Sequence, residues 1–279
     1  MTFLFVVATI LILLISFALS QLSVGCMGAA LGGIVEEVSV GAGPTLWFCT
    51  VRGIKLKFGA IPVGGYTRFL NQEALQKGET EEGIPVSREE GVPFEELPIG
   101  SRFITIGLGP LSFLCIGVIF FAIAQALPHS DVVVSSQSNF PIRPTAVPGL
   151  SVIPRHADAI SQAQLVLNTS LEFFWRVITL QSLQGWGGIL GMIVTCSGAG
   201  VLATGAWYSC MGAVIFGFGV INLLPLPGYS GGNLLFLLCE ALGKKPSERT
   251  FTIGVYASLI FFVILAGRIV YADIMWLGQ

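Results

Sequence analysis

The sequence predicts a membrane protein, mainly α-helical, with about four transmembrane helices and a small β region after the first helix. Two observations carry this prediction. Of the 279 residues, 53% are hydrophobic and 11% charged, and the mean hydropathy is +0.81, which is well above that of a soluble globular domain. The apolar residues also gather into runs near the length of about 20 that crosses a bilayer. Within a single domain, 1–279, the predicted spans are about 3–30, 102–127, 203–223 and 251–275.

The first apolar run begins at Phe3 and continues through a tract of small residues to about residue 30. A signal peptide would place basic residues before its apolar core, and none precede this run. We therefore expect a retained transmembrane helix. Its second half carries Ser20, Gln21 and Ser23 among several glycines, and small residues at this spacing favour close packing against another helix.

The segments between the spans differ in character. Residues 34–70 combine β-branched and aromatic side chains with Gly and Pro, which predicts two or three short antiparallel strands. Residues 71–100 are polar and acidic, as in a cytoplasmic solvated loop or an acidic docking site. Residues 128–185 predict an extracytoplasmic loop and an amphipathic helix near 159–181 that lies at the membrane interface.

Charge and metal-ligating residues exclude several functions. The net charge is −2 with no long basic run, which argues against nucleic acid as a partner. Six cysteines form no C-x-x-C pair and are interpreted as small buried hydrophobes. The two histidines, His129 and His156, lie in a polar stretch. Without a His-x-x-x-His pair, no helix presents two imidazoles to one zinc ion, so we expect no metal and no cofactor.

One irregular stretch, residues 222–236, reads N-L-L-P-L-P-G-Y-S-G-G-N-L-L-F between apolar runs. Its prolines and glycines break any helix, and broken backbone at membrane depth is tolerated only where it is buried in protein or lines a polar cavity. The alternative is a Pro/Gly loop just outside the bilayer. Periodicity leaves both interpretations open.

This stretch resembles the motif N-x-x-P-x-P-x-L-D-G-G of the site-2 protease family, the intramembrane zinc metalloproteases, in which the Asp binds zinc. Ser230 stands at the position of that Asp, and Tyr229 replaces the preceding Leu. The residues that match the motif are Asn222, Pro225, Pro227, Gly231 and Gly232.

Two further motifs extend the resemblance. The family strand V-E-x-x-S-x-G-x-G is matched by residues 35–43, and counting back from Gly32 places Ser20, Gln21 and Val24 where the family has His, Glu and His. Gly109 and Pro110 keep the family pattern G-P-x-x-N, with Phe113 in place of the Asn. If the count is right, Ser20, Gln21 and Ser230 should lie within about one hydrogen-bonding sphere.

The stretch G-A-I-P-V-G-G-Y, residues 59–66, resembles the membrane-associated β hairpin of the family, which is thought to hold substrate by strand addition. A folded hairpin that merely caps the helices is the alternative. About fifty residues near 128–185 are too few for the PDZ domain that many relatives carry there, so no PDZ domain is expected. The candidate groove for a partner or peptide comprises Gly59, Gly64, Gly65, Tyr66, Asn222, Pro225, Pro227 and Tyr229.

The resemblance and its departures together predict a protein that is not an enzyme. Ser20, Gln21, Val24 and Ser230 are poor zinc ligands, and Gln21 cannot act as a general base. We therefore expect a binding or structural subunit that joins other integral membrane proteins in a hetero-oligomeric complex. A regulator of an active site-2 protease or its substrates, and an active metallopeptidase with non-standard ligands, are the alternatives.

Charge also predicts the orientation in the membrane. With four spans, ten Lys and Arg residues fall on the side of loops 31–102 and 224–250, and only Arg143, Arg155 and Arg176 fall on the opposite side. Cytoplasmic loops carry the excess of Lys and Arg. We therefore expect a multi-pass protein with both termini outside the cytoplasm. The resemblance to the bacterial members of the site-2 protease family implies a bacterial inner membrane.

Overall fold

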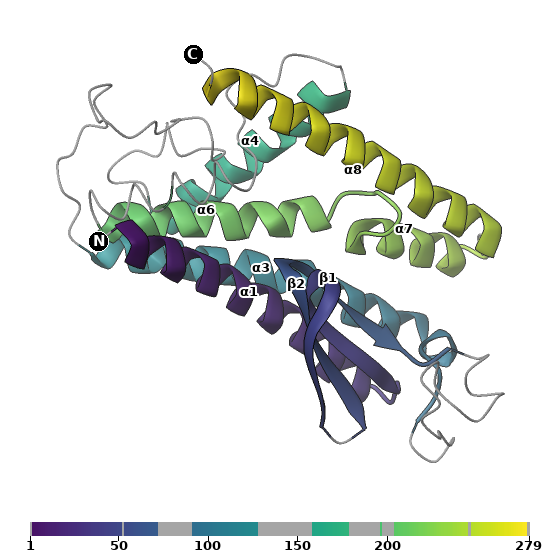
Figure 1. The fold of residues 1–279 in the computed structure, drawn as a ribbon. Helices are drawn as coiled ribbons and strands as arrows, with labels where there is room; N and C mark the ends of the chain where they lie inside the picture. The colour runs from purple at the N-terminus through teal and green to yellow at the C-terminus, as the bar shows by residue number, and fades with distance from the viewer. Residues whose placement is uncertain are drawn as a thin grey trace. The chain divides into compact units, whose positions relative to one another are not determined.

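The computed structural model describes residues 2–51, 53–71, 91–127, 158–178, 196, 204–244 and 247–277. Figure 1 shows helices with one two-stranded sheet. This confirms a mainly helical protein with a small sheet after the first helix. The elements are α1 (Thr2–Ala30), β1 (Val35–Val51), β2 (Ile54–Phe69), the 3-10 turn η2 (Phe94–Glu96), α3 (Ile99–Ala126), α4 (Ala159–Ile178), α6 (Thr204–Asn222), α7 (Ser230–Ala241) and α8 (Glu248–Leu277).

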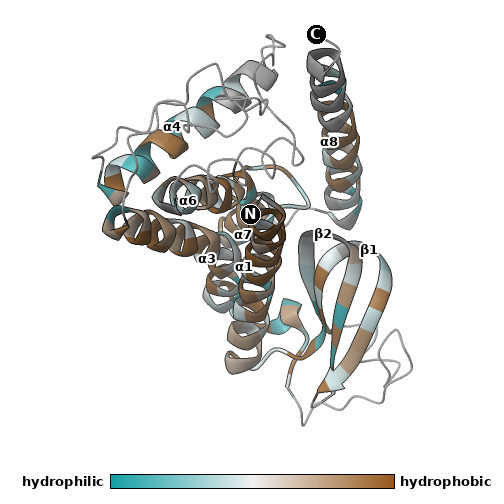
Figure 2. Cartoon of the chain, turned by 60° about the vertical axis from the view of Figure 1, so that its left-hand side comes forward, coloured by the Kyte–Doolittle hydropathy of each residue, from teal (hydrophilic) through white to brown (hydrophobic). Residues whose placement is uncertain are grey.

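Three helices are long and apolar enough to cross a membrane, namely those at Phe3–Ala30, Ile99–Ala126 and Gly205–Asn222. They belong to α1, α3 and α6, whose ribbons are mostly hydrophobic in Figure 2. In α8 the apolar stretch recognised among the described residues is shorter, Thr252–Leu265. A fourth span at α8 therefore stays a prediction.

Helix α4 differs from the apolar helices because hydrophilic and hydrophobic residues alternate along it (Figure 2). Its start is capped by Asp158, whose Oδ1 accepts a hydrogen bond of 2.8 Å from the Ser161 amide. Most of the loops predicted at 71–100 and 128–185, and both histidines, lie outside the described residues.

The sheet consists of two long strands, not two or three short ones. β1 has 17 residues and β2 has 16. β2 bends so that it passes β1 on both sides, and Val38 of β1 therefore lies opposite both Thr67 and Leu56 of β2. Within the described part of the chain, the segment around Gly65–Phe69 has a strand partner on one side only.

The chain forms two compact units. One comprises Met1–Ile12, Phe113–Ile221 and Thr252–Gln279, and the other comprises Leu13–Ser112 and Asn222–Phe251. In the first unit, α3 and α6 approach each other through glycines: a Cβ on Gly117 would lie 2.7 Å from Phe216 Cβ, and one on Gly212 would lie 2.6 Å from the Phe121 ring. Such contacts allow helix backbones to pack closely in a membrane.

Replacing Thr9 with valine should destabilise the first unit by about 1 kcal/mol, because a buried donor loses its acceptor. Trp207 Nε1 donates a hydrogen bond of 3.0 Å to Thr9 Oγ1, and both side chains are buried. The measurement is unfolding by titration with a denaturing detergent. Thr9→Ser keeps the hydroxyl and serves as the control, and equal stability of the two variants would contradict the role of this bond.

The interpretation of all six cysteines as buried hydrophobes is wrong. Cys196 and Cys210 form a disulfide, and Cys26 and Cys115 are exposed. The sequence could not indicate this pairing, because proximity of two sulfur atoms depends on how the segment before α6 folds.

Candidate functional site

Three helices of the second unit meet at Gly109 of α3. A Cβ added there would lie 3.3 Å from Val24 Cγ2, 3.6 Å from Ser230 Oγ and 3.8 Å from Ser20 Oγ. Ser20 and Val24 face this point together because residues four apart share one face of α1. The structure thus brings together three of the four positions selected from the resemblance.

The hydroxyl groups on α1 and α3 are mutually satisfied. The Ser20 hydroxyl donates to the Gly109 carbonyl oxygen at 3.0 Å, and the Ser23 and Ser112 hydroxyl oxygens lie 2.8 Å apart. Ser112 also lies 2.7 Å from the Leu108 carbonyl oxygen. These bonds hold the two helices together, as interhelical hydroxyl bonds do in membranes.

Gln21 is directed towards the sheet. The Thr67 hydroxyl lies 3.0 Å from the Gln21 backbone oxygen and 3.2 Å from its Oε1. A Cβ on Gly65 would lie 3.0 Å from Gln21 Cγ and 2.5 Å from the Ser39 carbonyl oxygen. Only a residue without a side chain permits this approach, so Gln21 connects α1 to β2.

The irregular stretch folds back on itself between α6 and α7. The Leu226 amide donates to the Leu224 carbonyl at 2.7 Å, and the Tyr229 amide donates to the Leu226 carbonyl at 3.1 Å. Gly228 has a φ of 91°, which favours glycine. α6 ends at Asn222, the segment with Pro225 and Pro227 follows, and Tyr229 precedes the first residue of α7.

The pair Gly231 and Gly232 has a packing role in this turn. A Cβ on Gly231 would contact the Leu223 and Leu224 carbonyl groups, and a Cβ on Gly232 would contact the Leu226 carbonyl. The backbone of the turn therefore lies directly on the first turn of α7. This packing presents Ser230 towards Gly109.

The candidate groove residues of β2 differ in their surroundings. Gly59 is paired with Thr45, and Gly64 has a φ of 81° with no neighbour within 4 Å of an added Cβ. Tyr66 is 43% exposed. Its hydroxyl donates to Glu37 Oε1 at 2.5 Å, and Lys57 Nζ lies over its ring, 5.8 Å from the ring centroid.

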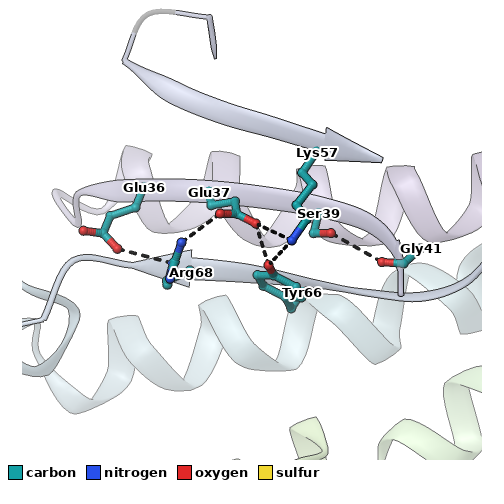
Figure 3. A network of polar contacts seen from close by, with 7 residues as sticks. All are labelled: Glu36, Glu37, Ser39, Gly41, Lys57, Tyr66 and Arg68. Atoms are coloured by element: carbon teal, nitrogen blue, oxygen red, sulfur yellow. Dashed lines mark hydrogen bonds and ion pairs between the residues drawn. The ribbon is translucent and has the colours of Figure 1, made fainter. Parts of the chain in front are cut away.

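Glu37 is the centre of a polar network between the strands (Figure 3). Its side chain is 3% exposed; Arg68 Nη2 lies 2.8 Å from Oε2, and Lys57 Nζ lies 3.8 Å from Oε1. Burial raises the pKa of Glu37, but the Tyr66 hydrogen bond and the charges of Arg68 and the lysines hold it below its ordinary value. The carboxylate is thereby kept ionised at the base of the hairpin.

Sequence reasoning missed the Glu37 network and also an ion pair between α3 and α7. Arg102, at the start of α3, and Glu240, near the end of α7, form two hydrogen bonds of 3.1 and 2.7 Å. An Arg at the start of one apolar helix and a Glu near the end of another could have indicated a pair, since charges in such segments need partners.

The side chains around Gly109 do not fit the zinc ion that the resemblance implies. Protein zinc sites use Cys, His, Asp or Glu, whereas Ser20 and Ser230 carry neutral hydroxyls and Val24 carries no lone pair. The Ser20 hydroxyl moreover already donates a hydrogen bond to the Gly109 carbonyl oxygen. Among the described residues no cluster of three His, Cys, Asp or Glu could hold a metal; His129, His156 and the acidic stretch 72–90 are not among them.

Relatives of the chain carry protease names. A candidate zinc metalloprotease from Thermotoga maritima is 30% identical over 45% of this chain and 25% of its own length. Another from Rhizobium meliloti is 21% identical over 86% of this chain and 88% of its own. Protease RseP from Photorhabdus luminescens is 37% identical over 30% of this chain and 38% of its own. The chain thus spans about a quarter of the Thermotoga relative that it matches.

These findings contradict the prediction that the chain is not an enzyme, because the relatives that it matches are named as proteases. That prediction rested on Ser20, Gln21, Val24 and Ser230, the positions that the resemblance aligns with the metal ligands and the general base of the family. The model of the peptidase family M50 matches residues 8–265, nearly the whole chain. The chain therefore belongs to peptidase family M50, the site-2 protease family.

Proposed function

We propose that this member of peptidase family M50 binds a membrane-spanning segment of another integral membrane protein and holds it in extended form beside Ser230. The observation that carries the proposal is two polar groups that have no hydrogen-bond partner in the described part of the chain. Among the described residues, neither Ser230 Oγ nor Gln21 Nε2 takes part in a hydrogen bond, although Ser20, Ser23 and Thr67 are satisfied. Both side chains are only half-buried, so the backbone of a ligand can reach these groups and form hydrogen bonds with them.

The neighbouring strand edge supports an extended ligand. Gly65 lies beside Gln21, and Gly65 and Tyr66 are paired with β1. The free side of such an edge presents alternate N–H and C=O groups that can form a ladder with an added strand. In a helical segment the backbone N–H and C=O groups are bonded to each other. The ligand must therefore unwind locally before it can pair with this edge.

A subunit role in a hetero-oligomeric membrane complex follows if the bound segment stays in place. If the bound segment instead dissociates and is replaced by others, the protein competes with an active relative for these segments. Both use the same groove, which includes Gly59, Asn222, Pro225, Pro227 and Tyr229.

Proteolysis of the bound segment is the second candidate, and the protease names of the relatives favour it. An extended, strand-paired segment exposes its peptide bonds, which is the ligand geometry that a protease needs. The side chains around Gly109, those of Ser20, Val24 and Ser230, supply no zinc ligands. Cleavage would therefore require groups from elsewhere in the chain or from a partner.

We also propose the orientation predicted from charge, with the Ser230 side of the protein towards the cytoplasm of a bacterial inner membrane. The Cys196–Cys210 disulfide supports this orientation independently. Disulfides persist in the oxidising space outside the cytoplasm, and Cys210 lies in the first turns of α6, at the end opposite to Asn222.

A photocrosslinking phenylalanine analogue in place of Tyr229 should label one membrane protein in cells, because the aromatic position adjoins Ser230. The same analogue at Phe103, an exposed position of α3, is the matched control and should label no discrete protein. We expect Gln21→Ala together with Ser230→Ala to reduce the Tyr229 adduct about tenfold, the effect of losing about 1.4 kcal/mol of binding. The measurement is the yield and mass of the adduct.

The mass of the labelled partner separates the two candidate functions. A full-length partner indicates holding, and a partner cut within its membrane segment indicates proteolysis. Equal labelling from positions 229 and 103 would contradict a binding site at Ser230.

A further inference from the structure

In the second unit, Arg102 of α3 and Glu240 of α7 form a bidentate ion pair. Arg102 Nη1 donates to Glu240 Oε2 at 3.1 Å, and Nη2 donates to Oε1 at 2.7 Å. The remaining guanidinium nitrogen, Nε, donates to the Leu97 carbonyl oxygen at 3.1 Å. Arg102 is 7% exposed. The guanidinium is therefore fixed on both sides and largely shielded from solvent.

α3 and α7 also contact each other at a second place, where Ser230 approaches Gly109. Seven residues separate Arg102 from Gly109, about 10 Å along α3, and ten residues separate Ser230 from Glu240, about 15 Å along α7. Contacts at two points this far apart fix both the axial position of α7 along α3 and its rotation about its own axis. The ion pair is the charged contact that the structure describes between these two helices, and it fixes the end of α7 opposite to Ser230.

We propose that Arg102 and Glu240 are positioning residues whose ion pair holds Ser230 at Gly109, beside Ser20 and Val24. Apolar contacts between helices tolerate sliding, whereas a bidentate Arg–carboxylate pair has one preferred distance and direction. Separation of the pair would leave a buried charge without its partner, which is strongly unfavourable. The pair contacts no ligand itself. Its effect on ligand binding rests on the proposed function, but its effect on Ser230 does not.

The position of Ser230 can be measured by disulfide crosslinking. The pair Gly109→Cys and Ser230→Cys reports on α3 and α7, because the two positions lie within disulfide range. The pair Ser23→Cys and Ser112→Cys, whose hydroxyl oxygens are 2.8 Å apart, reports on α1 and α3 as the control. Both pairs are placed in full-length protein that keeps the Cys196–Cys210 disulfide and has alanine at Cys26, Cys49, Cys115 and Cys239.

Arg102→Gln or Glu240→Gln should slow the 109–230 crosslink about tenfold, because an unpaired buried charge displaces α7, and should leave the 23–112 crosslink within about twofold. The exchange of charges in Arg102→Glu with Glu240→Arg should recover most of the lost rate. An unchanged 109–230 rate in both single variants would overturn the proposal. So would a parallel loss of both crosslinks, because that result indicates a general structural role.

Labelling from position 229 in the same variants separates this inference from the proposed function. Slower 109–230 crosslinking with weaker labelling supports both. Slower crosslinking with unchanged labelling supports the positioning role and counts against a ligand at Ser230.

Discussion

Gly231→Ala is expected to destabilise the protein by about 3 kcal/mol, because its methyl group overlaps backbone that cannot move independently. An added Cβ would contact the Leu223 and Leu224 carbonyl groups, and the Leu224 carbonyl already accepts the Leu226 amide. Relief of the overlap would require the turn to lift from α7. The measurement is the free energy of unfolding in a detergent titration, together with labelling from position 229, which should fall with it.

Gly107→Ala is the matched control for this substitution. Gly107 lies within α3, and an added Cβ would have no neighbour within 4 Å. Alanine there should leave stability unchanged or raise it by about 0.5 kcal/mol through its better helix propensity. If Gly231→Ala unfolds at the same detergent concentration as Gly107→Ala, the packing role assigned to Gly231 is wrong.

Glu37→Gln is expected to destabilise the hairpin by about 2 kcal/mol at pH 7, because Arg68 and Lys57 lose their shared anion. The value is below that of a fully buried pair, since the Arg68 and Lys57 side chains are 32% and 21% exposed and water partly compensates them. Limited proteolysis of residues 35–69 reports this local loss. Glu95→Gln, at an exposed carboxylate of η2, should change nothing.

The same carboxylate predicts a dependence on pH. Burial acts to raise the pKa of Glu37, but the Tyr66 hydroxyl and the neighbouring cations lower it below the ordinary value of 4.5. A group with a lowered folded-state pKa contributes its full stability above its unfolded-state pKa and loses it as the pH falls through the folded-state pKa. Wild-type protein should therefore lose hairpin stability below about pH 4.5, and Glu37→Gln should lack this component. An identical acid response in both proteins would contradict it.

The apolar runs were sufficient to predict where the main helices lie. The expected span of 102–127 corresponds to α3 at Ile99–Ala126, and the expected span of 203–223 corresponds to α6 at Thr204–Asn222. Bilayer thickness and backbone hydrogen bonding impose these lengths, so the length of each span can be predicted from one contiguous apolar run. The two long strands were harder to predict, because β2 bends past both sides of β1 and this pairing depends on the register of distant residues.

The sequence motifs predicted the location of the site correctly but not its activity. The motif count selected Ser20, Val24 and Ser230 from segments up to 210 residues apart, and it carried the resemblance to site-2 proteases. It also led to the prediction that the chain is not an enzyme, which family relatives contradict. Residue identity at four positions was too narrow a basis for that prediction, since a catalytic group can come from any segment that the fold brings near.

By itself the sequence determined the apolar helices, the break after Asn222 and the membership of peptidase family M50, because helix length, helix-breaking residues and motif spacing are local properties. Only the tertiary structure decided that Gln21 turns towards Thr67, that Gly231 underlies the turn, and that Arg102 reaches Glu240 138 residues away. These contacts depend on how helices pack, and packing is set by the whole of each interface rather than by any one segment.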